Sequence, residues 1–217
     1  MANTLQRKML NLGLPGIILM ASLLITTAGG LANPSGVSAP QAAQANTDYT
    51  HALEAYATPG AFQAELEKRV GRWNVECTEW ASADLKPSTS TGTAEFKMTM
   101  GGRFVEQQYQ TEGDGRKVVG WGLAGHNNIT KQFQFTWVDN WGTGMLQGTG
   151  QADGGAIVWS ATFTDPLKGA IQLRMEETAK GDDEFSVTMY GIIGDQSEYK
   201  MREIIYRRQH EGAVDSE

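Results

Sequence analysis

Cysteine is nearly absent from this sequence, since Cys77 is the only one among 217 residues. A single cysteine cannot form a disulfide within the chain, which excludes a disulfide-stapled scaffold. The fold must therefore be stabilised by packing, or by pairing with another chain. Cys77 lies in the strand-like segment 75–78, where a small buried hydrophobic side chain is its expected role.

Histidine and positive charge are also scarce. The three histidines, His51, His126 and His210, do not have the spacing of metal ligands, so the sequence predicts no metal site. Lysine and arginine total 18 against 25 aspartates and glutamates, which gives a net charge of −7. An acidic chain of this kind lacks the basic face that nucleic acid requires. It also lacks the positive surface that would hold a peripheral domain on anionic lipid.

No charged residue lies between Asn11 and Thr47. Arg7 and Lys8 precede an apolar run, which is followed by small residues as far as Ala32, and this is the layout of an export signal. We therefore expect residues 1–32 to be a signal peptide, with cleavage after Ala32 or after Ala45. The expected location is periplasmic or secreted, without stable membrane association after cleavage. An uncleaved membrane anchor is the alternative, because the apolar run approaches the ~20 residues of a membrane span.

Residues 33–57 are predicted to be a flexible linker, because their Pro, Ser, Ala and Gln bury too little surface to repay ordering. Within this linker, a short helix is possible from Asp48 to Ala57. Thr58 and Pro59 are typical of a helix start, and the apolar spacing predicts a helix to about Val70. Residues 58–210 are expected to form one domain, and residues 211–217 a disordered tail.

The hydrophobic period changes to two from Trp73 onward, and glycine, asparagine, aspartate, serine or proline interrupts it every ten to fifteen residues. The predicted strands are 72–80, 91–100, 103–112, 116–124, 131–138, 143–151, 155–164, 169–178, 184–192 and 197–208. The connections between these strands are short and one face of the predicted sheet is apolar. Two architectures fit this pattern: a β-sandwich and an up-and-down barrel. We expect an all-β, ten-stranded antiparallel barrel with a short N-terminal helix, since closure removes exposed edges and no long crossover is evident. Glycines within strands, such as Gly120 and Gly148, suit the bends of a small barrel.

Two resemblances strengthen this expectation. Gly71-Arg72-Trp73, after a short helix and at the start of the first strand, resembles the Gly-x-Trp signature of lipocalins and the wider calycin group. This resemblance implies that Trp73 closes one end of the barrel, with an arginine of the last strand over its ring. Arg202 is the arginine that we assign to this closure, and Arg207 and Arg208 lie close to it in the sequence.

The second resemblance covers about residues 60–208. Five ordered blocks are similar to those of the bacterial family known as domain of unknown function 1579: Gly71-x-Trp73-x-Val75, Gly92-x-Ala94-Glu95, Gly101-Gly102-Arg103-Phe104-Val105-Glu106, Gly120-x-Gly122-x-x-Gly125, and Trp137-x-Asp139 with Thr143-Gly144. The family's usual Tyr-Asp-Asn is His126-Asn127-Asn128 here. The resemblance implies a calycin-like barrel and no established activity. No cofactor is predicted. A haem held by His126 or His210 is the alternative, by likeness to the nitrobindin-like calycins.

A barrel of this size holds either a filled core or one small ligand, and an interior rich in Trp, Phe and Met suits an apolar molecule. The expected function is binding of a small apolar ligand, at the end near Trp137 and Asp139. The predicted ligand-binding residues are Arg103, Trp121, Phe135, Trp137, Asp139 and Trp159. A filled-core barrel that binds other proteins is the alternative. A less favoured hypothesis is an enzyme acting through Asp139, Arg103 and His126, which requires these three side chains to converge.

Overall fold

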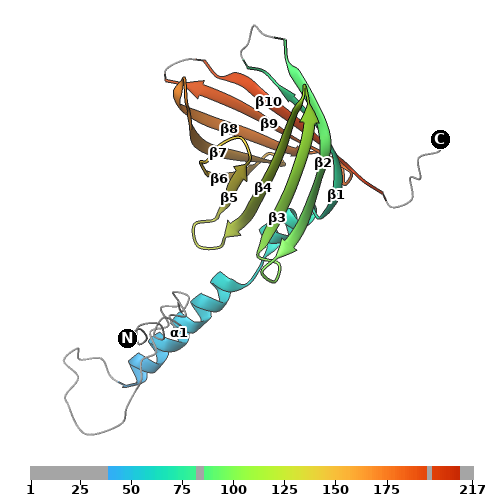
Figure 1. Cartoon of the computed structure of the whole chain (residues 1–217). Coiled ribbons are helices and arrows are strands. Elements are labelled where there is room, and N and C mark those ends of the chain that lie inside the picture. Colours follow the sequence, from blue (N-terminus) through green and yellow to red (C-terminus); the bar gives the residue numbers. More distant parts are fainter. Residues whose placement is uncertain (1–38, 82–85, 195–196, 211–217) are drawn as a thin grey trace, which may run out of the picture. The chain divides into compact units, whose positions relative to one another are not determined.

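The computed structural model describes residues 39–81, 86–194 and 197–210, and it confirms the predicted fold (Figure 1). Ten antiparallel strands close into a barrel in which each strand pairs with its neighbours in the sequence, and β1 pairs with β10. The strands are β1 Gly71–Glu79, β2 Ser88–Thr99, β3 Phe104–Gly113, β4 Arg116–Asn127, β5 Gln132–Asp139, β6 Leu146–Asp153, β7 Ala156–Asp165, β8 Gly169–Ala179, β9 Glu184–Ile193 and β10 Tyr199–Arg208. Each begins and ends within three residues of its prediction.

The segment before the barrel differs from its prediction. Residues Ala39–Ala57 form one 19-residue helix, α1, where we predicted a flexible linker that ended in a shorter helix. Alanine and glutamine, which dominate its first half, are strong helix formers, and Pro40 falls in the first turn, where proline is tolerated. The expected signal peptide and C-terminal tail lie outside the described residues. None of the helices in the described segments is both long enough and apolar enough to span a membrane.

The second helix, α2, is shorter than predicted and runs from Ala61 to Glu67. Gly60 is its N-cap, in place of the expected Thr58, and the Gln63 side chain accepts a hydrogen bond of 2.8 Å from the Gly60 amide. The other end of the Gln63 amide donates to the His126 carbonyl near the end of β4, and Leu66 is fully buried. These contacts dock α2 across one end of the barrel, which we call the closed end.

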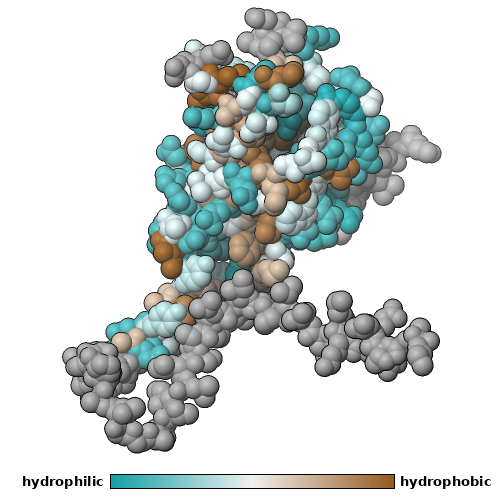
Figure 2. Space-filling view, turned by 60° about the vertical axis from the view of Figure 1, so that its left-hand side comes forward, coloured by the Kyte–Doolittle hydropathy of each residue, from teal (hydrophilic) through white to brown (hydrophobic). Residues whose placement is uncertain are grey.

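Strand register fixes which side chains face the interior. Trp73, Val75 and Cys77 alternate along β1 and are all buried, and their partners across β10 are Arg208, Tyr206 and Ile204. Following this parity around the sheet places one side chain in two inside the barrel. On the outside, hydrophilic and apolar residues are intermingled over the face that Figure 2 shows.

Candidate functional site: the barrel interior

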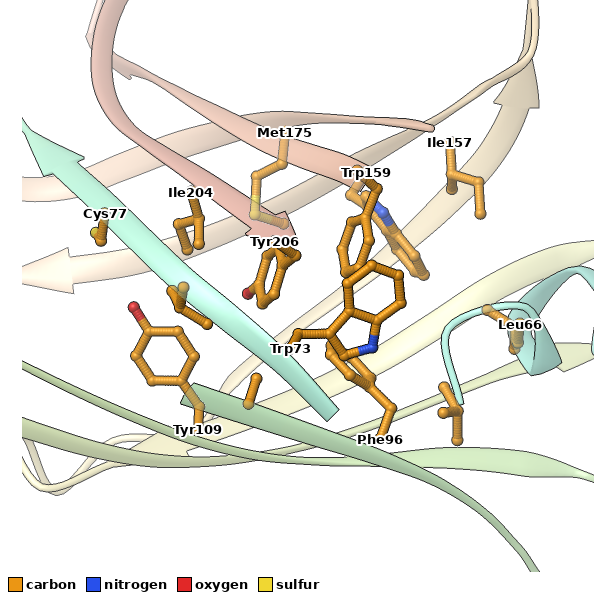
Figure 3. Close-up of a cluster of buried hydrophobic side chains, with 14 of the residues drawn as sticks. Leu66, Trp73, Cys77, Phe96, Tyr109, Ile157, Trp159, Met175, Ile204 and Tyr206 are labelled. Carbon is orange, nitrogen blue, oxygen red and sulfur yellow. The ribbon is translucent and has the colours of Figure 1, made fainter. Parts of the chain in front are cut away.

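The closed half of the barrel interior is a packed aromatic core. Trp73 is 2% exposed, packs edge to face against Phe185 with 4.8 Å between ring centroids, and donates from Nε1 to the Arg69 carbonyl at 2.8 Å. Phe185 in turn stacks on Tyr206 at 4.3 Å. Figure 3 shows this cluster, with Leu66 at one side and Cys77 and Tyr109 at the other. Apart from a small hollow at the closed end, this core packs closely around Trp73.

Further from the closed end, the interior is less completely filled. Several apolar side chains pack against the core but stay partly exposed, although strand parity points them into a closed barrel. Met98 and Ala124 lie at the closed end, beside the turn between β2 and β3. The others lie further along their strands: Val118, Phe135, Trp137, Val187 and Met189. Exposure at such positions means that solvent reaches them inside the barrel. Helix α2 covers the closed end, and we call the opposite end of the barrel the open end.

Trp137 is held in place by the strand beside it. Its ring lies over Gly120 and Gly122, where a Cβ atom would meet the ring at 2.2 Å and 3.1 Å, respectively. Its Nε1 donates to the Asp139 carboxylate at 2.9 Å, and the other oxygen of that carboxylate accepts from the Trp141 amide at 2.9 Å. These glycines therefore make room for an aromatic ring, and their role in bending the barrel stays a prediction.

One side of the interior carries hydrogen-bonding groups. We call Glu79, Gln107, Tyr109, Arg202 and Tyr206 the polar wall; they face inward from β1, β3 and β10. Arg202 forms an ion pair with Glu79, and their side chains remain 40% and 31% exposed. The Gln107 amide donates to the Tyr206 hydroxyl at 3.1 Å. Burial raises the pKa of Tyr109 and of Tyr206, so both stay protonated donors.

The opposite side of the interior carries apolar groups. We call Val118, Phe135, Trp137, Val187 and Met189 the apolar wall; they face inward from β4, β5 and β9. Since β3 pairs with β4 and β10 pairs with β9, the two walls adjoin at both edges. Apart from the carboxylates of Asp139 on β5 and Glu177 on β8, the interior thus has one polar and one apolar side.

Four of the six predicted ligand-binding residues face the interior, and two do not. Phe135, Trp137 and Asp139 lie along β5 toward the open end, while Trp159 is 5% exposed within the core and donates from Nε1 to Glu177. Trp121 lies on the outer face of β4 and is 36% exposed, because the inward positions on either side of it are the glycines beneath Trp137. Its predicted place in the ligand-binding wall was wrong.

Arg103 lies far from Trp137. It follows the turn between β2 and β3 at the closed end, where its exposed guanidinium donates to the Met100 and Gly101 carbonyls. This position contradicts its predicted role as an anchor for a ligand near Asp139, which is at the open end. The local sequence, Gly-Gly-Arg, indicated a turn but not which end of the barrel the turn occupies.

The enzymatic hypothesis required Asp139, Arg103 and His126 to converge, and they do not. Asp139 lies six residues from the strand position opposite His126, which corresponds to about 20 Å. His126 faces into the closed end, where its ring stacks on Phe62 at 4.1 Å, and its Nε2 has no hydrogen-bond partner among the described residues.

The arginine over Trp73 is Arg208, and the prediction of Arg202 was wrong. Trp73 pairs directly with Arg208 across the β1–β10 ladder, and the guanidinium carbon lies 4.1 Å from the indole centroid. Arg208 also donates to the carbonyls of Lys68 and Val70, which fastens the last strand to the end of α2. Gly71 is required here, because its φ is +128° and a Cβ atom would lie 2.8 Å from Arg208 Nη1.

A second ion pair lies at the closed end of the interior. Arg69 pairs with Glu177 of β8, and their side chains are only 11% and 12% exposed. Burial raises the pKa of Glu177, and it outweighs the opposite effects of Arg69 and of the Trp159 hydrogen bond. Glu177 was not among the functional residues predicted from the sequence. The inward parity of Glu177, two residues after Met175, was the signal that would have found it.

Two small hollows lie at the ends of the barrel. The one at the open end, about 30 Å³, is lined by Glu79, Ser88, Ser90 and Arg116. The one at the closed end, about 70 Å³, lies beside Arg69 and Glu177. Volumes of this size hold a few water molecules, whereas small-molecule sites measure about 300–1,000 Å³. Neither hollow alone holds a ligand.

Comparison with known proteins supports the architecture. The crystal structure of Rv2717c from M. tuberculosis is similar over 70% of this chain and 100% of its own, with a TM-score of 0.50 and 16% sequence identity. The S-type phycobiliprotein lyase CPES from Guillardia theta is similar over 70% of this chain and 94% of its own, with a TM-score of 0.50 and 9% identity. Likenesses at these identities concern the fold alone.

No curated protein matches the sequence. A family model does match it, over residues 58–208, which includes all ten strands. The match spans more than half of the chain and starts just before α2. The chain therefore belongs to the family described as "Protein of unknown function (DUF1579)".

Proposed function

We propose that this protein binds a small, mostly apolar molecule between the two walls of the barrel interior, and that the ligand enters at the open end. The partial exposure of inward-facing apolar side chains carries this proposal. In a barrel with a filled core, Trp137, Val187 and Met189 would be buried as completely as Trp73 and Phe133 are. Covering this exposed apolar surface is a source of binding free energy of about 25 cal/mol per Å².

The test uses Nile red, a neutral apolar dye whose emission rises in dry surroundings. The wild-type protein should bind it, and Val187→Phe, which adds a bulky ring to the apolar wall, should weaken binding at least tenfold. Val119→Phe is the matched control: Val119 is 47% exposed on the outer face of β4, so its substitution should change the dissociation constant less than twofold. Absence of Nile red binding, or equal weakening in both variants, would contradict the proposal. Such results would favour a filled-core barrel that binds other proteins.

We propose in addition that the protein is exported. The support is the layout of residues 1–32, with Arg7 and Lys8 before an uncharged apolar run. Expression of the full chain in a bacterium with two membranes should yield a periplasmic product that begins after Ala32 or Ala45, as intact mass would show. A product of full-length mass in the membrane fraction would instead indicate an uncleaved anchor.

A further inference from the structure

We infer that the interior selects a neutral ligand with a hydrogen-bonding end or edge, such as a long-chain alcohol, over the corresponding carboxylate. This inference rests on the proposed function and adds the chemical class of the ligand. It depends on two features of the interior: the pairing of its inward-facing charges, and the grouping of its uncharged hydrogen-bonding side chains Gln107, Tyr109 and Tyr206 on β3 and β10.

The inward-facing charges are compensated in the part of the chain that the structure describes. Arg202 pairs with Glu79 near the open end, and Arg69 pairs with Glu177 at the closed end. Asp139 accepts hydrogen bonds from Trp137 and the backbone after it. Arg69 and Arg202, the two cations that the described segments place inside the barrel, therefore each have an acidic partner.

Two further arginines lie at the rims of the barrel. Arg208 at the closed end pairs with Asp183. Arg116 at the open end is exposed to water, and its guanidinium carbon lies 3.4 Å from the centroid of the Trp141 ring. Neither provides a buried, uncompensated positive charge. With a net charge of −7, the chain as a whole also disfavours approach of an anion.

Burying an ionised carboxylate without a partner is far more costly than burying a hydroxyl that finds one. The polar wall offers such partners. Arg202 has five N–H donors, of which its ion pair with Glu79 occupies only part. Gln107, Tyr109 and Tyr206 add amide and hydroxyl groups deeper in the barrel, and the facing apolar wall receives the hydrocarbon. A ligand with one neutral polar end matches both walls.

Competition against Nile red tests this selectivity. In the wild-type protein, 1-decanol should displace the dye at a concentration at least tenfold lower than decanoate at pH 8. Glu79→Gln leaves Arg202 without its carboxylate partner. Decanoate should then displace the dye at a concentration at least tenfold lower than in the wild type, while the concentration of decanol required should change little. Arg202→Gln should weaken decanoate binding relative to the wild type, so that a higher concentration of decanoate is needed to displace the dye. Glu76→Gln is the matched control, because Glu76 lies on the outer face of the same strand and pairs with Arg207; it should leave both competitors unchanged.

The possible failures are distinguishable. If Nile red binds and Val187→Phe weakens it, but decanoate competes as well as decanol, the proposed function stands and the selectivity inference is overturned. The same conclusion follows if Glu79→Gln leaves the preference unchanged in a variant whose thermal unfolding matches the wild type. If Nile red does not bind at all, the proposed function fails, and the inference fails with it.

Discussion

Replacing Trp73 with alanine should lower the free energy of unfolding by about 3–5 kcal/mol, the usual cost of deleting a large aromatic side chain from a core. Trp73 is 2% exposed, packs against Phe185, lies beneath Arg208 and donates a hydrogen bond to the carbonyl that follows α2. Alanine removes all of these contacts and leaves a cavity where the helix, the first strand and the last strand meet. Urea denaturation followed by circular dichroism measures the loss.

Two further variants separate the causes. Trp73→Phe keeps a ring in the core but loses the hydrogen bond to Arg69, so it should cost clearly less than the alanine variant. Trp121→Ala removes the same side chain from the outer face of β4, where it is 36% exposed, and should cost less than about 1 kcal/mol. Equal destabilisation by Trp73→Ala and Trp121→Ala would show that Trp73 does not have the structural role assigned to it.

The fold could be predicted because alternation and turn residues are local properties of the sequence. In β7, for example, Ile157, Trp159, Ala161 and Phe163 alternate with polar or smaller residues, and glycines stand just before the strand. The helix α1 could not be predicted from the same reasoning. Alanine and glutamine have little apolar bulk, which is typical of an unfolded linker, but they also have high helix propensity. The segment forms a helix, as that propensity favours.

The candidate site was predicted less completely. To place a side chain, one must know whether it faces into or out of the barrel, and at which end of the barrel it lies. Trp121 and Trp137 lie in the neighbouring strands β4 and β5, but only Trp137 faces inward, where Gly120 and Gly122 of β4 receive its ring. Arg103 was assigned to the wrong end. Arg202 and Arg208 both face inward from the same strand, and only the β1–β10 register shows which of them lies opposite Trp73. Such long-range pairing is not encoded in any single segment.

Replacing Arg69 with glutamine should lower the free energy of unfolding by about 3–5 kcal/mol at pH 7.5, because it leaves a buried carboxylate without its cation. Arg69 and Glu177 are both nearly buried. Lys68→Gln is the matched control: Lys68 is the neighbouring cation, and its pair with Glu65 is largely exposed, so its substitution should lower the free energy of unfolding far less than Arg69→Gln does. Glu177→Gln introduced into the Arg69→Gln variant should restore most of the stability, since no buried charge remains.

The cost of Arg69→Gln should also depend on pH, with a sign that the structure fixes. Burial already raises the pKa of Glu177 above its ordinary value, and Arg69 opposes that rise, so removing Arg69 raises the pKa further. An acid whose pKa is higher in the folded state destabilises the fold when ionised, and the penalty is relieved as pH falls through the folded pKa. The stability difference between wild type and variant should therefore shrink from pH 7.5 to pH 5 in urea denaturation. A difference that stays constant or grows over this range would mean that the ionised Glu177 is not the source of the cost.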